Sequence, residues 1–286
     1  MIQANIRSIV DNMIENNTFP SFSIISGVKG SGKHSLCRYI ANKLNLEIIY
    51  FQPTAEDIDN FINIAYNQNR EVLYVLEDMD TANYLVKYSI LKITEEPVRY
   101  SKVILLCSTK DQLLNTILSR GVLFEIPPYT KNELKEYAVE KNLPLENIEQ
   151  CLEICSYPGE LEIALKSDLT AILKLTNNIL ENISRASLSN ALSINTKLKT
   201  KDNKEGYDLN LFLNCMKYSI LNSVTLKKID IDKSISILNI LSNIQSVRYF
   251  KGMNEKYLID EFILRTWLIF KGVGYGDIWI KTKNIR

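Results

Sequence analysis

Several features that would assign the chain to a class of protein are missing from its sequence. It contains no run of about eighteen apolar residues, so we expect no membrane-spanning helix. The N-terminal stretch MIQANIRSIVDNMIENN has helical spacing and lacks the apolar core of a secretory signal, so we expect a cytoplasmic protein. The 34 basic and 33 acidic residues nearly cancel, and a net charge of +1 does not make the whole surface attractive to nucleic acid. A basic patch on one domain is still compatible with this balance.

Cysteine is scarce and shows no paired pattern. The five cysteines form no C-x-x-C motif, and their odd number leaves one over, so we interpret them as reduced, mostly buried thiols. Cys151 and Cys155 lie one helical turn apart, a spacing that two metal ligands can have, but the sequence offers no two further ligands nearby. We therefore expect no metal site here and no bound zinc.

The first half of the chain alternates short apolar runs with helical patterns, which is typical of a parallel sheet with crossover helices. Five apolar runs are expected to form strands: residues 22–27, 46–51, 71–80, 103–109 and 122–126. After a break at Pro127 and Pro128 the pattern is almost entirely helical, apart from a polar stretch at Asn195–Asp208 that we interpret as a loop. The sequence thus predicts an α/β fold followed by an all-α region.

The stretch GVKGSGKHS, from Gly27 to Ser35, nearly matches the phosphate-binding loop pattern G-x-x-x-x-G-K-[ST]. It follows an expected strand and precedes an amphipathic helix, which is the context that the motif requires. Glycines allow backbone N–H groups and a helix N-terminus to converge on an anion, and Lys33 would reach the β and γ phosphates. ATP or ADP is therefore the candidate cofactor. The candidate nucleotide-binding residues are Gly27, Gly30, Ser31, Gly32, Lys33, His34 and Ser35.

His34, the only histidine of the chain, stands where the pattern has the hydroxyl residue that binds Mg²⁺. Magnesium prefers oxygen ligands at short octahedral distances, and an imidazole nitrogen is a poor substitute. Ser35 lies about 100° further round the helix and cannot take over this role. We interpret His34 as a first-turn helix residue without a metal. Phosphate binding is expected to survive, whereas magnesium-assisted hydrolysis would be lost or slowed.

Two acidic residues, Glu77 and Asp78, lie in the acidic end of the third expected strand. A Walker B strand ends in an Asp that contacts the water shell of the metal. A Glu follows it and orients the attacking water. Here the order is reversed, and a displacement of about 1 Å matters for catalytic positioning. We interpret Glu77 and Asp78 as an altered form of this catalytic pair.

The stretch DMDTANYLVKYSILKITEEPVRYSKVILLCST, from Asp78 to Thr109, resembles the bacterial clamp-loader family of AAA+ proteins. Members carry a run such as NALLKTLEEPP, which reads SILKITEEPV here. Downstream, LLNTILSRGVLFEI (Leu113–Ile126) is similar to the family segment LLPTIRSRCQ. The resemblance is strong from about Pro20 to Ile126 and weak beyond, where MNEKYLIDEFIL is similar to the collar domain. A bacterial and a phage origin both remain open.

The resemblance implies roles for further residues. The Ser-Arg of the family motif donates an arginine finger to the ATP of a neighbouring subunit, and it matches Ser119 and Arg120, with Gly121 in place of the cysteine. Sensor 1 is expected at Ser108 or Thr109, which adds Thr109 to the nucleotide-binding candidates. Active members carry an arginine at the start of a lid helix, where this chain has Gly159 and no arginine. The four-cysteine zinc insertion of the family is absent.

The resemblance also implies three domains. A RecA-like AAA+ module is expected at residues 1–128, a small helical lid at 129–167 and a helical collar at 168–286 that oligomerises with other subunits. The magnesium ligand, the acid pair and the lid arginine are altered, while the finger is kept. This combination is most similar to the delta-prime subunit, which supports the ATPase site of its neighbour.

We therefore expect a delta-prime-like stator subunit with little or no ATPase activity of its own. Its implied partners are gamma/tau-like and delta-like subunits, a sliding clamp and the backbone of primer–template DNA, contacted without sequence specificity. One alternative is an active gamma-like ATPase, which predicts Mg²⁺-dependent ATP turnover by the isolated chain. Another is a non-catalytic AAA+ interaction protein with no role in replication.

Overall fold

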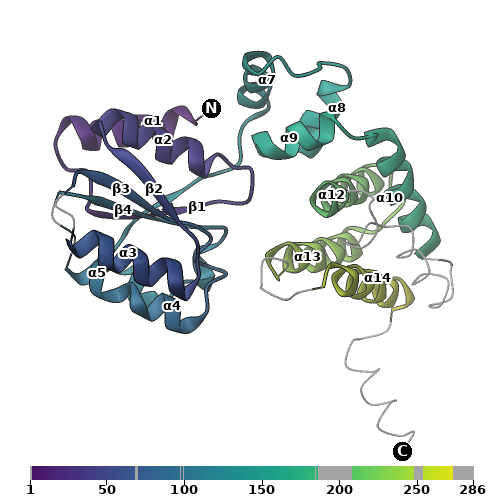
Figure 1. The fold of residues 1–286 in the computed structure, drawn as a ribbon. Coiled ribbons are helices and arrows are strands. Elements are labelled where there is room, and N and C mark those ends of the chain that lie inside the picture. The colour runs from purple at the N-terminus through teal and green to yellow at the C-terminus, as the bar shows by residue number, and fades with distance from the viewer. Residues whose placement is uncertain are drawn as a thin grey trace, which may run out of the picture. The chain divides into compact units, whose positions relative to one another are not determined.

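The chain forms two compact units, described here from a computed structural model of residues 2–67, 70–96, 98, 100–183, 185, 208–247 and 254–272 (Figure 1). The first unit comprises Met1–Tyr137 and Tyr157–Gly159, and the second comprises Ala138–Ser156 and Glu160–Arg286. The three domains expected from the sequence stay a prediction. The expected loop at Asn195–Asp208 and the C-terminal tail lie almost entirely outside the described residues.

A five-stranded sheet forms the centre of the first unit, with the strand order β2-β3-β4-β1-β5. Every neighbouring pair is parallel, and in one register Ile24 of β1 lies opposite Leu105 of β4. The sequence VLYVL of β3 is buried along its whole length, as expected for a strand with helices on both faces. The strands are β1 (Phe22–Ser26), β2 (Glu47–Phe51), β3 (Val72–Leu76), β4 (Lys102–Cys107) and β5 (Val122–Glu125).

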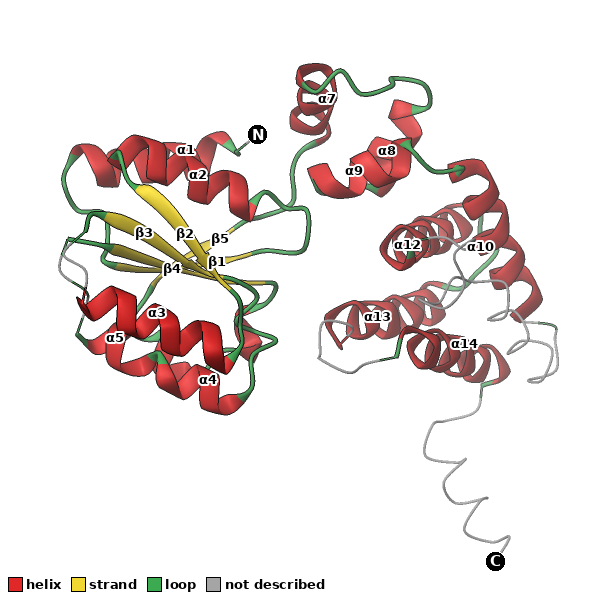
Figure 2. Cartoon of the chain, viewed as in Figure 1, coloured by secondary structure: helices red, strands yellow, loops and turns green. Residues whose placement is uncertain are grey.

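Helices cover both faces of this sheet, α1 and α2 on one face and α3, α4 and α5 on the other (Figure 2). Phe51, Phe61 and Tyr74 pack together beneath α3, with ring centroids 5.3–6.2 Å apart. The helices are α1 (Ala4–Glu15), α2 (Lys33–Leu44), α3 (Ala55–Asn67), α4 (Tyr84–Ser89), α5 (Leu91–Glu95), the short 3-10 helix η1 (Lys110–Gln112), α6 (Asn115–Leu118) and α7 (Lys131–Glu140), whose last residues belong to the second unit.

The rest of the chain is helical in its described part. In α12 the apolar residues Phe212, Met216 and Ile220 are buried, because they recur at the spacing of one helix face. The predicted α/β region followed by an all-α region is therefore confirmed. The helices are α8 (Ile148–Ile154), α9 (Pro158–Leu165), α10 (Leu169–Ile183), α12 (Leu209–Thr225), α13 (Ile231–Val247) and α14 (Glu255–Lys271).

All five cysteines are buried free thiols, as the sequence predicts. Burial raises the pKa of Cys37, Cys107 and Cys215 to about 12, so these thiols are inert at neutral pH. Within the described ranges, no cluster of three or more His, Cys, Asp or Glu side chains is arranged to hold a metal ion. No helix in the same ranges is long and apolar enough to cross a membrane.

Candidate phosphate-binding site

The predicted phosphate loop connects β1 to α2, at the edge of the sheet where the parallel strands end. Gly27 N–H donates to the carbonyl of Cys107, the last residue of β4 (3.1 Å). Gly30 and Gly32 have φ angles of +83° and +103°, which residues with a side chain rarely adopt. Gly32 is also the residue that precedes α2. The glycines of the motif are thus required by the turn, and the turn directs the N-terminus of α2 toward the loop.

Lys33 is held inside its own loop. Its side chain is buried, and Nζ donates to the carbonyl of Gly27 (2.5 Å) and more weakly to that of Val28 (3.4 Å). Burial lowers the pKa of Lys33, and the nearby carboxylates of Asp78 and Asp80 oppose this shift. A phosphate that entered the loop would replace these carbonyls as the partner of the ammonium group.

His34 is joined to the first residue of the acid pair. Its Nε2 lies 2.6 Å from Oε1 of Glu77, and its half-exposed ring lies 5.8 Å from that of Tyr50. The other carboxylate oxygen of Glu77 accepts a hydrogen bond from Nε2 of Gln52, the residue after β2. Both oxygens of Glu77 therefore already have donors from the chain itself.

The hydrogen bonds of Glu77 with His34 and Gln52 bear on whether Mg²⁺ can bind at the loop. The metal requires oxygen ligands in octahedral geometry. The loop position supplies an imidazole nitrogen, and Glu77 is hydrogen-bonded through both oxygens to His34 and Gln52. The residues present therefore do not fit a magnesium ion.

The second acid, Asp78, has a left-handed backbone with φ of +43°, and its carbonyl accepts a hydrogen bond from the Thr81 hydroxyl (2.8 Å). The nearby Asp80 is buried, and its Oδ2 accepts a hydrogen bond from the N–H of Ser108 (3.0 Å). Its Oδ1 has no hydrogen-bond partner among the described residues. Burial raises the pKa of Asp80, and the Ser108 hydrogen bond partly offsets this effect. Asp80 thus joins the ends of β3 and β4 beneath the loop.

Thr109, the expected sensor 1 residue, follows β4 and caps the short helix η1. Its Oγ1 accepts a hydrogen bond from the N–H of Asp111 (3.4 Å) and donates to a carboxylate oxygen of the same residue (3.4 Å). The Thr109 hydroxyl is thereby directed to its own turn. Its neighbour Ser108 holds Asp80 through its backbone.

The beginning of α9 lies against the phosphate loop within the first unit. Gly159 N–H donates to the carbonyl of Gly30 (3.0 Å). A Cβ atom on Gly159 would lie 2.6 Å from the Cα of Gly30, and a Cβ on Gly30 would lie 2.9 Å from the Cα of Gly159. Tyr129 supports the same contact, since its hydroxyl donates to the carbonyl of Ser31 (3.2 Å) and its ring meets that of Tyr157 edge to face. Two glycines are therefore needed for this approach of two backbones.

Arg120, the expected finger, follows α6, and 31% of its side-chain surface is exposed. Its guanidinium donates to Glu95 Oε1 (2.7 Å) and to the carbonyl of Thr116 (2.5 Å). Glu95 belongs to the EEP run and Arg120 to the SRG run, so the two sequence motifs are joined by an ion pair. A Cβ on Gly121 would lie 2.8 Å from the Phe22 ring and 2.9 Å from the Ile24 side chain. This packing explains why the residue after Arg120 is glycine.

Comparison with known proteins agrees with these motifs. Residues 49–130 match the family model described as DNA polymerase III, delta subunit. The chain is also 26% identical over 280 residues to DNA polymerase III subunit gamma of Buchnera aphidicola, covering 80% of this chain and 73% of that protein. Both matches indicate the clamp-loader AAA+ family of DNA polymerase III subunits. The match to the family model includes Glu77, Asp78 and Arg120 but begins after the phosphate loop.

Solved structures support the fold of the chain. The Holliday junction branch migration motor RuvB of Thermotoga maritima aligns with a TM-score of 0.51 at 14% identity, over 94% of this chain and 88% of that one. A mutant of RuvB aligns with the same TM-score at 16% identity, over 95% of this chain and 89% of that one. Both alignments concern the AAA+ fold alone.

The structure brings most of the predicted residues into one site. The phosphate loop and Glu77 are in direct contact through His34, and Lys33 lies close enough to Asp78 to be affected by its charge. Arg120 is bonded elsewhere, to Glu95 and Thr116. The motifs of the sequence assign no role at the loop to Gln52, Asp80, Tyr129 or Tyr157. Only Asp80 could have been noticed in the sequence, because it is a third acid that follows β3 closely, after Glu77 and Asp78.

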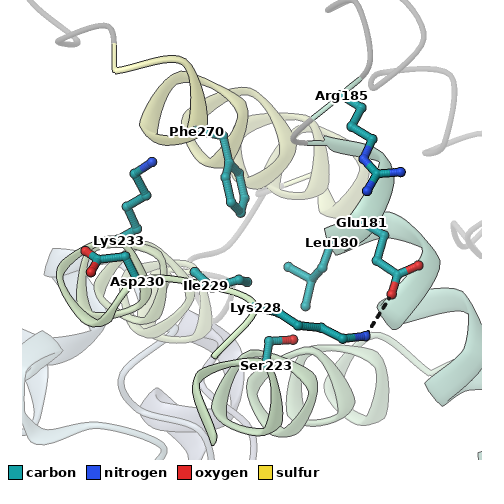
Figure 3. A pocket seen from close by; sticks show the side chains of 9 residues that line it. All are labelled: Leu180, Glu181, Arg185, Ser223, Lys228, Ile229, Asp230, Lys233 and Phe270. Carbon is teal, nitrogen blue, oxygen red and sulfur yellow. Dashed lines mark hydrogen bonds and ion pairs between the residues drawn. The ribbon is translucent and has the colours of Figure 1, made fainter. Parts of the chain in front are cut away.

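The helical unit contains a hollow of about 620 Å³ that includes none of the predicted site residues (Figure 3). Leu180 and Phe270 give it apolar walls, and Lys228 on its rim forms an ion pair with Glu181 (3.2 Å). Side chains of both charge signs thus line the hollow together with the apolar ones. The lining residues are Leu180, Glu181, Arg185, Ser223, Lys228, Ile229, Asp230, Lys233 and Phe270.

Proposed function

We propose that this clamp-loader subunit acts like delta-prime: it supports ATP hydrolysis on a neighbouring subunit and has little or no ATPase activity itself. The observation that carries the proposal is the bonding of the loop residue His34 to Glu77. Donors from the chain on both oxygens of Glu77 compete with an attacking water or a metal-bound water for this carboxylate. The altered acid order and the absence of an arginine near Gly159 support the same function.

Arg120 is the residue that would act on the neighbour. Its guanidinium is planar and permanently charged, and it can stabilise the charge that develops on a transferred phosphoryl group. Glu95 and the Thr116 carbonyl hold it beside α6 at a partly exposed position. In the assembly, the γ-phosphate of the neighbour's ATP would compete with Glu95 for the guanidinium.

The assembly that we propose contains gamma/tau-like and delta-like subunits and operates in the cytoplasm. It would open a sliding clamp and load it at primer–template junctions, with DNA contacted through its backbone in a salt-sensitive manner. ATP or ADP binding by this chain is part of the proposal, whereas catalysis by its own loop is not.

The test is ATP turnover by a reconstituted complex that contains the gamma-like subunit of the same organism, the clamp and primed DNA. Arg120→Ala in this chain should lower turnover at the adjacent site by roughly 10³-fold, because an arginine finger contributes about that much to phosphoryl transfer. Lys110→Ala is the matched control, since it removes another exposed cation paired with an acid, Glu125 at 3.0 Å, and should leave turnover unchanged. Equal turnover by the Arg120→Ala and wild-type complexes would exclude the finger.

The gamma-like alternative has its own support in the named Buchnera relative and in the retained Lys33. It predicts Mg²⁺-dependent phosphate release by the isolated chain that Lys33→Ala abolishes. The delta-prime-like function predicts no such release. A chain that joins no clamp-loader complex would instead favour the third function, an interaction protein outside replication.

A further inference from the structure

The residues at the metal position of the phosphate loop form a closed hydrogen-bonded set. His34 on α2 bonds one oxygen of Glu77, and Gln52 from the neighbouring strand end bonds the other. The backbone of Gln52 is fixed in turn, because its N–H donates to Asp57 Oδ2 (2.9 Å) and its carbonyl accepts from Thr54 N–H (2.8 Å). The set therefore connects the loop helix, the end of β3 and the β2–α3 turn through side chains of the protein itself.

We propose that the loop binds the phosphates of a nucleoside di- or triphosphate without magnesium, and that His34, held by Glu77, occupies the place of the cation. The inference rests on the proposed function, since it specifies which form of the nucleotide the chain's own loop selects. A magnesium–nucleotide complex would have to displace the imidazole from Glu77 and then coordinate an atom that Mg²⁺ disfavours.

The loop contains other groups that favour an anion. Lys33 is buried beside the loop carbonyls and can transfer its hydrogen bonds to a phosphate. The first N–H groups of the twelve-residue helix α2 follow directly, and a helix N-terminus favours negative charge. These groups act on the phosphates themselves, so the free nucleotide keeps its binding partners when the metal is absent.

The experiment measures the affinity of purified full-length chain for fluorescent ADP and ATP, once with excess EDTA and once with Mg²⁺. For the wild-type chain we expect Mg²⁺ to leave the affinity unchanged or to weaken it. Mg²⁺ binds the nucleotide in solution and so lowers the concentration of the metal-free nucleotide, which is the form that the loop binds. His34→Thr places a hydroxyl at the position and releases one oxygen of Glu77. In this variant Mg²⁺ should tighten binding by roughly ten- to 100-fold, the range of one bond to a charged group.

Two further variants separate the role of His34 from a general disturbance of the loop. His34→Gln keeps a side-chain N–H that can bond Glu77, so its affinity should remain independent of Mg²⁺. Mn²⁺ provides a second readout, because electron paramagnetic resonance detects the bound ion directly. Mn²⁺ should bind to His34→Thr with nucleotide and should not bind to the wild-type chain or to His34→Gln.

Three results would overturn the inference. The wild-type chain could bind nucleotide more tightly in Mg²⁺ than in EDTA, or could bind none under either condition. The third result is a folded His34→Thr variant whose nucleotide affinity is the same with and without Mg²⁺. Thermal melting of each variant shows whether it is folded. The proposed function has a separate readout, since the effect of Arg120→Ala is measured on the neighbour's ATP turnover. A failure of the inference can therefore be distinguished from a failure of the proposed function.

Discussion

At the scale of single residues, the most informative positions are those where a side chain is absent. Gly121 replaces a cysteine of the family motif, and a Cβ there would lie within 2.9 Å of Phe22 and Ile24. Both of these residues are buried in the core of the sheet and cannot move aside freely. The glycine after Arg120 is therefore explained by packing against β1, and this explanation leads to a measurable stability difference.

Gly121→Cys, which restores the residue of the family motif, should lower the free energy of unfolding by about 1–3 kcal/mol, because it overpacks the core beneath β1. Urea denaturation followed by circular dichroism measures this change. Ser119→Cys is the matched control: it introduces the same side chain at an exposed position two residues earlier and should change stability by less than about 0.5 kcal/mol. Equal stabilities of the two variants would show that the core yields to the added atoms.

At the scale of elements, the contact between α9 and the phosphate loop depends on two backbones approaching each other. Gly159→Ala would place a Cβ 2.6 Å from the Cα of Gly30 and should break the hydrogen bond from Gly159 N–H to the Gly30 carbonyl. We expect a loss of about 1–3 kcal/mol in unfolding free energy and faster amide hydrogen exchange across residues 27–33. Lys166→Ala, an exposed change just after α9, should alter neither quantity. Unchanged exchange in Gly159→Ala would contradict a role for this contact in holding the loop.

Elements also show how far the sequence alone could predict the site. The five strands followed from apolar runs, although β3 covers only Val72–Leu76 of the expected 71–80. The loop followed from glycines whose positive φ angles the turn requires. The hydrogen bonds of Glu77 to His34 and Gln52 were not predictable, because they join three segments whose proximity is fixed only by the order β2-β3-β4-β1-β5. The approach of Gly159 to Gly30 gives no local signal either, since an isolated glycine at a helix start has several ordinary explanations.

At the scale of the whole molecule, the two compact units differ in how they are built. The first depends on a parallel sheet, whose strands are all distant in sequence from at least one partner. The second depends on helices whose neighbours in the chain pack together, as α12 does with α13 and α13 with α14. Its buried side chains include Leu213, Met216, Leu241 and Phe262, so it has an apolar core that does not require the sheet.

This difference predicts that a fragment of residues 138–286 folds without the rest of the chain. It should give a helical circular dichroism spectrum and a cooperative thermal transition, because its own helices bury the apolar face of α12. A matched fragment with Met216→Asp should lose the transition, since an unpaired charge would be buried at the centre of that face. A wild-type fragment that melts without cooperativity would mean that the helical unit obtains its stability from the first unit. The division of the chain into two compact units would then describe its geometry and not its folding.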